Sequence, residues 1–128
     1  MGRTTIRLES GSKAVGPYCS GGRGGRLLFS SGQTSLDPEG NAIGVGDVET
    51  QTVETLKNLV AVLAAGGASV EDIVKTTVFL PDLRHYVSMN EAYAKFFPKD
   101  PPARSTILAP LALPELLVEI EAVAVLGD

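Results

Sequence analysis

The clearest periodic pattern in the chain is a helical stripe of apolar residues near its middle. Its members recur at a spacing of three or four and are Val53, Leu56, Leu59, Val60 and Leu63. This spacing predicts a helix with one buried face. Gly46-Asp47 opens the helix, Glu49 lies in the first turn where an acid suits the macrodipole, and Gly66-Gly67 ends it.

A second helix is expected between Pro81-Asp82, which begins it, and Pro98, which ends it. One side of this helix carries Leu83, Tyr86, Asn90, Tyr93 and Phe97. The larger residues on that side predict that it packs on the rest of the fold.

Six short segments have the composition of strands. Their expected ranges are 4–8 at an edge, 18–20, 27–31 as a buried strand, 73–80 as a central strand, 103–109 and 116–126. The glycine-rich segment Gly21 to Arg26 lacks the spacing of a phosphate-binding loop and leads into a strand, so we interpret it as a turn. Asp37-Pro38-Glu39-Gly40-Asn41 is also a turn.

The expected order is three strands, a helix, a strand, a helix and two strands. Two strand–helix–strand units with right-handed crossovers place both helices on the same face of one mixed sheet. The sequence contains no internal repeat or linker. We therefore predict an α+β fold and a single domain over residues 1–128.

The last two predicted strands carry charge. Because side chains alternate across a strand, Arg104, Thr106 and Leu108 share one face of the first. On the second, one face is apolar (Val118, Ile120, Ala122, Ala124 and Leu126) and the other holds Glu119, Glu121, Val123 and Val125.

We expect the helices to cover the apolar face and to leave open a face that carries Leu108, Val123 and Val125. A half-apolar open face predicts a homo-oligomer with clefts between subunits, where Arg104 meets the glutamates. A guanidinium and a carboxylate in such a cleft suit the binding of a small carboxylic acid. An ordinary structural ion pair is the alternative.

Composition narrows the possible functions. The chain has 128 residues, is 44% hydrophobic and carries a net charge of −4, so it can build a core and is a poor match for general nucleic-acid binding. One Cys and one His exclude the usual zinc sites and an internal disulfide. We expect no metal and, without a signal peptide or membrane span, a cytoplasmic location.

Several short motifs, taken together and in order, resemble those of the RidA (YjgF) family along nearly the whole chain. They are Gly16-Pro17-Tyr18, Ser31-Gly32-Gln33, Asn58-Leu59, Val74-Lys75-Thr76-Thr77-Val78-Phe79, Asn90-Glu91-Ala92-Tyr93 with Phe97, Pro102-Ala103-Arg104-Ser105 and Glu119-Ile120-Glu121-Ala122. The resemblance implies a chorismate-mutase-like fold and a homotrimer with a ligand cleft at each subunit interface.

The resemblance also implies an activity, which is the cofactor-independent hydrolysis of 2-aminoacrylate and related enamines and imines to 2-keto acids and ammonia. Arg104 stands at the family's carboxylate-binding position, and Glu119 at the position thought to orient or activate water. Tyr18, Ser31 and Asn90 stand at positions that line the cleft. The expected partners are a small carboxylate substrate and other copies of the chain, with no nucleic acid and no membrane.

One departure from the family is Thr106, where many members have a cysteine two residues after the arginine. A hydroxyl can donate a similar hydrogen bond, so we expect Thr106 to contribute to substrate binding and activity to survive. The segment that leads to Arg104, Phe97-Pro98-Lys99-Asp100-Pro101-Pro102, is similar to the same segment in the branch of the family that handles 3-aminoacrylate. A non-catalytic carboxylate sensor remains an alternative, as does a ribonuclease or translation inhibitor, which the acidic composition disfavours.

Overall fold

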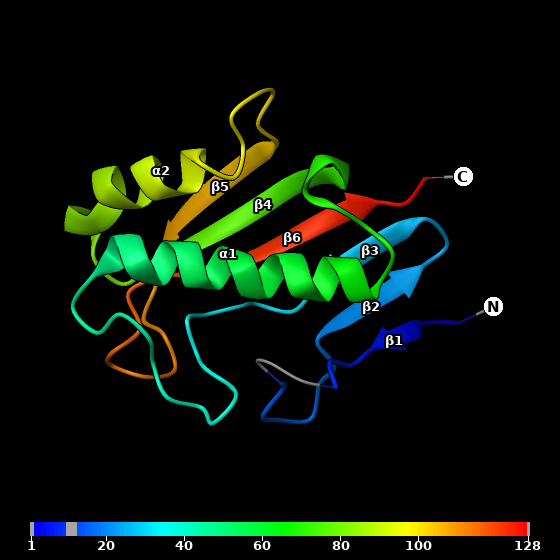
Figure 1. The fold of residues 1–128 in the computed structure, drawn as a ribbon, viewed down its shortest axis with the longest axis horizontal. Helices are drawn as coiled ribbons and strands as arrows, with labels where there is room; N and C mark the ends of the chain where they lie inside the picture. The colour runs from blue at the N-terminus through cyan, green and yellow to red at the C-terminus, as the bar shows by residue number, and fades with distance from the viewer. Residues whose placement is uncertain (1, 10–12, 128) are drawn as a thin grey trace.

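The fold is one six-stranded mixed sheet with two α-helices on one of its faces, as the sequence predicts (Figure 1). The structure is a computed structural model and describes residues 2–9 and 13–127. Its elements are β1 Thr4–Ile6, β2 Gly21–Gly24, β3 Leu27–Ser30, α1 Val48–Ala65, β4 Ile73–Leu80, α2 Tyr86–Ala94, β5 Ala103–Leu108 and β6 Glu119–Val125, with short 3-10 turns η1 Val70–Asp72 and η2 Leu83–His85.

The strand order in the sheet is β1-β2-β3-β6-β4-β5. The last strand, β6, lies between β3 and β4 and pairs antiparallel with both, while β4 and β5 are parallel neighbours. In the described residues, β3–α1–β4 and β4–α2–β5 are therefore two crossovers between parallel strands. Both bring their helix to the same face of the sheet (Figure 1).

Helix α1 begins and ends where the sequence predicts. Asp47 is the N-cap, and its carboxylate accepts hydrogen bonds from the backbone N of Thr50 at 3.2 Å and from the Thr50 hydroxyl at 2.7 Å. These two bonds lower the pKa of Asp47. Gly66 is the C-cap, and Gly67 follows with a φ of 89°, which favours glycine.

The core lies between the sheet and the helices. The predicted apolar face of the last strand is buried there at Val118, just before β6, and at Ile120, Ala122 and Ala124, all at most 3% exposed, whereas Leu126 is only half-buried. On α1, Leu56, Leu59 and Leu63 are buried as predicted, but Val53 and Val60 are only half-buried. No helix within the described residues is both long enough and apolar enough to cross a bilayer.

The glycine-rich segment is not simply a turn, which corrects the prediction. Gly21–Gly24 is strand β2, and only Gly25-Arg26 form the turn to β3, with Gly25 at a φ of 59°. Glycine disfavours strands, but pairing along both β1 and β3 imposes the extended form here. The predicted strand 18–20 is wrong, because these residues lie in bends that precede β2.

Two further predictions need correction. Strand β3 is buried only at Leu28, whereas Leu27 and Phe29 are 44% and 48% exposed because no helix covers their side of the sheet. The second helix begins later than predicted, since Asp82 caps η2 and α2 starts at Tyr86. Leu83 is therefore exposed, while Tyr93 packs on Phe97 with ring centroids 4.7 Å apart.

Candidate functional site

A cleft of about 580 Å³ opens beside the start of β6. Its polar lining includes Tyr18, Ser31 and Glu119, which the sequence predicts as site residues. Its apolar lining comes mainly from Leu36 in the segment after β3 and from Leu113 and Leu116 in the loop before β6. The cleft thus combines one carboxylate with an apolar wall.

The segment that follows β3 fixes the polar side of this cleft. Ser31 donates a hydrogen bond from its hydroxyl to the backbone oxygen of Cys19 at 2.7 Å, which holds the segment bearing Tyr18 against it. Gln33 pairs with Ile120 through two backbone hydrogen bonds of 2.8 and 3.0 Å. A Cβ on Gly32 would collide with the Glu119 carboxylate, so glycine at this position leaves the space that the carboxylate occupies.

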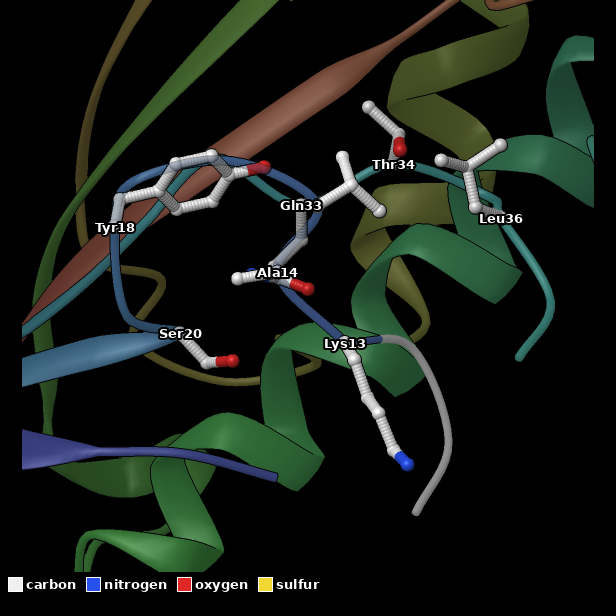
Figure 2. A pocket seen from close by; sticks show the side chains of 9 residues that line it. Lys13, Ala14, Tyr18, Ser20, Gln33, Thr34 and Leu36 are labelled. Atoms are coloured by element: carbon white, nitrogen blue, oxygen red, sulfur yellow. The ribbon is translucent and has the colours of Figure 1, made fainter. Parts of the chain in front are cut away.

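A smaller hollow lies behind Tyr18 and shares part of its lining with the cleft (Figure 2). Ser20 and Gln33, which are 3% and 7% exposed, line this hollow. Figure 2 shows the Tyr18 ring at one side of the hollow, on the loop that carries it, and the Lys13 side chain extending away from the hollow. The polar lining continues beyond the cleft into the space under Tyr18.

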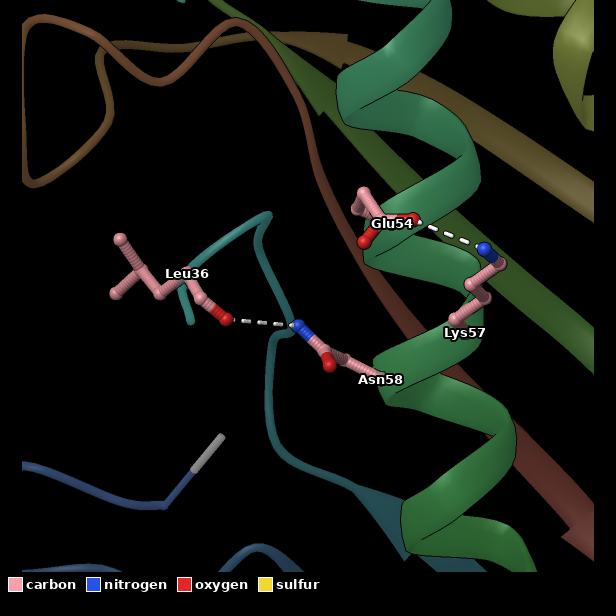
Figure 3. Close-up of polar contacts among 4 residues, drawn as sticks. All are labelled: Leu36, Glu54, Lys57 and Asn58. Atoms are coloured by element: carbon pink, nitrogen blue, oxygen red, sulfur yellow. Dashed lines mark hydrogen bonds and ion pairs between the residues drawn. The ribbon is translucent and has the colours of Figure 1, made fainter. Parts of the chain in front are cut away.

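Helix α1 holds both walls of the cleft through two polar side chains. Asn58 donates to the backbone oxygen of Thr34 at 2.8 Å. It also donates to the backbone oxygen of Leu36 at 3.3 Å, and Figure 3 shows this bond. The fully buried Gln51 donates to the backbone oxygen of Glu115 at 2.8 Å and accepts from the backbone N of Leu117 at 2.8 Å. These bonds satisfy backbone groups of the irregular loops and set their positions.

Glu119 is half-buried where it lines the cleft. Burial raises the pKa of its carboxyl group, and the charge of the neighbouring Glu121 raises the pKa further. A carboxylate with a raised pKa is a stronger base than that of an ordinary glutamate. It is suited to act as a general base toward a bound water.

Arg104 lies elsewhere, at the edge formed by β5 and α2. Its guanidinium carbon is 4.9 Å from the ring centroid of Tyr93 and 5.7 Å from that of Tyr86. Its Nη2 donates a hydrogen bond to the Tyr86 hydroxyl at 3.3 Å. The Tyr93 ring is itself anchored, because its hydroxyl lies 2.6 Å from that of the buried Thr76.

The predicted site residues therefore form two groups within one protomer. Tyr18, Ser31 and Glu119 meet at the cleft, whereas Arg104 and Asn90 meet at the β5–α2 edge, where hydrogen bonding from Asn90 lowers the pKa of Tyr86. Thr106 faces the same side of the sheet as Arg104, and no described contact joins it to either group.

The two groups lie on opposite faces of the sheet, which corrects the prediction that Leu108 shares the open face with Val123. Arg104 and Leu108 pair with Thr76 and Leu80, whose side chains are buried under the helices. The register between strands was not available from the sequence, and it puts Leu108 on the helix side.

Three residues with roles at the site were not predicted from the pattern. Gln51 and Asn58 support the cleft, and Tyr86 contacts Arg104 rather than packing in the core. Gln51 is a polar residue at a core position of an amphipathic helix, which is a usable signal. The sequence gives no comparable signal for Tyr86, because its contact with Arg104 depends on how α2 lies against β5.

Comparison with known proteins identifies the family. The family model described as endoribonuclease L-PSP matches residues 9–126. A Salmonella typhimurium protein named 2-iminobutanoate/2-iminopropanoate deaminase is 39% identical over 124 residues, with 94% of this chain and 96% of the relative covered.

Two solved structures from E. coli share the fold. The YjgF gene product is 38% identical, with 95% of this chain and 98% of the other covered and a TM-score of 0.86. TdcF with bound serine is 36% identical, with 97% and 99% covered and a TM-score of 0.87. The agreement in sequence extends over nearly the whole length and coincides with agreement in fold, so the chain belongs to the RidA (YjgF) family.

Proposed function

We propose that the protein hydrolyses enamine and imine intermediates, such as 2-aminoacrylate, 2-iminopropionate and 2-iminobutyrate, to 2-keto acids and ammonia. The observation that carries this proposal is Glu119, a half-buried carboxyl group with a raised pKa beside Ser31 and Tyr18 in an open cleft. Support also comes from the Salmonella relative, whose name is that of an imine deaminase. The apolar wall of the cleft suits the short alkyl side chains of these substrates.

The reaction needs only water, a base and a grip on the substrate. Arg104 binds the substrate carboxylate through its guanidinium fork. Glu119 takes a proton from a water molecule as the water oxygen bonds to the imine carbon, and the C=N π electrons become a lone pair on nitrogen. Glu119 returns that proton to the nitrogen, which gives a carbinolamine. The hydroxyl proton then passes to the nitrogen as the C–N bond breaks, so that a C=O group forms and ammonia leaves. An enamine such as 2-aminoacrylate enters this sequence as its imine tautomer, 2-iminopropionate. The imine carbon is already electrophilic, so neither a metal nor an organic cofactor has to activate it.

The proposed site needs two protomers, because Arg104 and Glu119 face opposite sides of the same sheet in one chain. The open face of the sheet exposes apolar side chains to water, since Leu27, Phe29 and Ile107 are each more than 40% exposed on it. Exposed apolar surface of this kind favours burial against a partner. Packing this face on a neighbouring copy buries these residues and brings the β5–α2 edge of one copy toward the cleft of the next. The proposed number of copies is three, which is what the family resemblance implies.

Three other functions use overlapping features. A carboxylate sensor would use the same residues without turnover, and a 3-aminoacrylate deaminase would differ only in substrate. A ribonuclease is suggested by the description of the matching family model, but the net charge of −4 opposes binding to phosphates. Among these, a deaminase makes the fullest use of a carboxyl group with a raised pKa.

A coupled assay tests the proposal. A pyridoxal-phosphate dehydratase generates the imine in place, and the release of pyruvate or 2-ketobutyrate is followed with and without the protein. We expect faster release with the wild type and a loss of about 100-fold in kcat for Glu119→Gln, the lower end for general-base catalysis.

Binding separates the rival functions. Calorimetric titration with a stable keto acid is expected to give similar affinities for the wild type and Glu119→Gln, because Glu119 acts on water. Equal losses of binding and turnover would favour a sensor. If the wild-type protein does not accelerate imine hydrolysis, the deaminase proposal is refuted. If it accelerates 3-aminoacrylate hydrolysis preferentially, the substrate is that of the related branch of the family.

A further inference from the structure

The Tyr86 hydroxyl has an unusual set of neighbours at the β5–α2 edge. Tyr86 is the first residue of α2, and its side chain is partly open to solvent, with the residue 39% exposed. Arg104 donates a hydrogen bond to the hydroxyl oxygen at 3.3 Å. Asn90, one turn further along α2, also hydrogen-bonds to the Tyr86 side chain and is the largest cause of its lowered pKa, ahead of the charge of Arg104.

These contacts determine whether the Tyr86 hydroxyl donates or accepts a hydrogen bond toward a ligand. A hydrogen bond that lowers the pKa of a phenol is one donated to its oxygen. A phenol group can accept a hydrogen bond through its oxygen and donate one through its proton, and the Tyr86 oxygen here accepts from Arg104 Nη2. Within the described part of the chain, no hydrogen bond uses the proton of Tyr86. It remains free for an acceptor that comes from outside the protomer.

The guanidinium beside it is held by the surrounding side chains. Arg104 lies over the ring of Tyr93 at 4.9 Å, and the hydroxyl of Tyr93 is fixed to Thr76 at 2.6 Å. A guanidinium constrained on its face by a ring still presents N–H groups at its edge. The Tyr86 hydroxyl lies 3.3 Å from Nη2 of that guanidinium, so the two groups can donate to the same anion.

We infer that Tyr86 is a further substrate-binding residue, whose hydroxyl donates a hydrogen bond to the carboxylate that Arg104 grips. The identity of that carboxylate, as part of a 2-imino or 2-keto acid, rests on the proposed function. The anion site is then a guanidinium–phenol pair, and it selects an acceptor-only carboxylate over a neutral amide. Because Tyr86 contacts the carboxylate and not the reacting carbon, it contributes to binding more than to the chemical step.

The variant Tyr86→Phe tests this inference, since it removes the hydroxyl and keeps the ring beside Arg104. Pyruvate is titrated calorimetrically into the wild type and the variant, and pyruvamide serves as the uncharged comparator. We expect pyruvate to bind about tenfold more weakly to Tyr86→Phe, the loss of one hydrogen bond to a charged group. Pyruvamide should bind both proteins alike. In the coupled assay, KM should rise by a similar factor, with kcat essentially unchanged.

Val87→Ala is the matched control, because Val87 is the next residue of α2, is 66% exposed and carries no polar group. We expect it to bind pyruvate as the wild type does. A merely structural role for Tyr86 would weaken pyruvate and pyruvamide binding together, and that result would overturn the inference. Wild-type affinity for pyruvate in Tyr86→Phe would also overturn it, as would a wild-type protein that does not bind pyruvate.

The same measurements keep this inference separate from the proposed function. If the wild type binds pyruvate and Tyr86→Phe weakens that binding, the role of Tyr86 in carboxylate binding stands even when the coupled assay shows no imine hydrolysis. If the wild type hydrolyses imines and Tyr86→Phe has an unchanged KM and pyruvate affinity, the deaminase proposal stands and the role of Tyr86 is refuted.

Discussion

Arg104 and Glu119 lie on opposite faces of one sheet, two strands apart. Arg104 on β5 pairs with Thr76 of β4, and Glu119 on β6 pairs with Phe79 of the same strand. Residues three apart on a strand point to opposite faces, and paired residues share a face. The strands β5 and β6 are roughly 10 Å apart across β4. A single protomer therefore cannot present both side chains to one small substrate.

Mixing two impaired variants should restore activity if the site joins Arg104 of one protomer to Glu119 of another. Arg104→Ala and Glu119→Gln are each expected to keep at most about a tenth of wild-type activity. After unfolding and refolding as an equal mixture, about a quarter of the interfaces in a cyclic oligomer should pair an intact arginine with an intact glutamate, half times half. The coupled assay on the mixture should show about that fraction of wild-type activity.

The controls for this experiment are the two variants unfolded and refolded separately, which should keep only their own low activity. A refolded wild-type sample measures the yield of refolding. If the mixture refolds into oligomers and is no more active than its components, the two residues act within one protomer and the inter-subunit site is wrong.

Replacement of Arg104 should mainly affect substrate capture. Hydrogen bonds to a charged group contribute about 1.5–3 kcal/mol each, so Arg104→Ala should lower kcat/KM by one to two decades or more. Arg104→Lys keeps the charge but loses the planar fork, so we expect it to be impaired as well. Steady-state kinetics measures both effects, and light scattering checks that the variants remain oligomeric. Wild-type kinetics in folded Arg104→Ala would exclude Arg104 from the site.

Glu119 should make the folded protein less stable as pH rises. Its pKa is raised in the folded state, so the fold favours the protonated form. The stability that this group contributes is fully present below the pKa of an unfolded glutamate and is lost as pH rises through the raised pKa. Glu119→Gln, which cannot ionise, should therefore gain stability relative to the wild type near pH 7 but not near pH 4. Urea unfolding at both pH values measures the difference.

The control for this prediction is Glu71→Gln, which removes the same formal charge from an exposed residue of η1. It separates the local effect at the cleft from the effect of net charge, and all samples are compared at one protein concentration because assembly adds to stability. An advantage of Glu119→Gln that is the same at both pH values, or that grows in acid, would contradict the raised pKa.

Asn58 should contribute more to the free energy of unfolding than Lys57, its charged neighbour on α1. Asn58→Ala leaves the backbone oxygens of Thr34 and Leu36 without their donor, which should cost about 1–3 kcal/mol. Lys57→Ala removes an ion pair to Glu54 at 3.2 Å that is largely open to solvent, which should cost at most about 1 kcal/mol (Figure 3). Urea unfolding of both variants tests the order, and equal losses would show that Asn58 does not hold the cleft.

Local chemistry in the sequence determined much of the fold. The caps at Asp47 and Gly66 and the buried side of β6 were predicted correctly, because capping and side-chain alternation depend on neighbours in the chain. Two crossovers between parallel strands then placed both helices on one face. The ordered motifs indicated the family, and they pointed to Tyr18, Ser31 and Glu119, which the structure brings together at one cleft.

Only the tertiary structure decided how the strands align and which side chains meet. Gly21–Gly24 became a strand because both neighbouring strands pair with it, against the preference of glycine. The register of β4 with β5 and β6 put Arg104 and Glu119 on opposite faces, and a shift of one residue in either pairing would have reversed that result. The contact of Tyr86 with Arg104 likewise arises from the packing of α2 against β5, since residues distant in sequence become neighbours only when the sheet and its helices assemble.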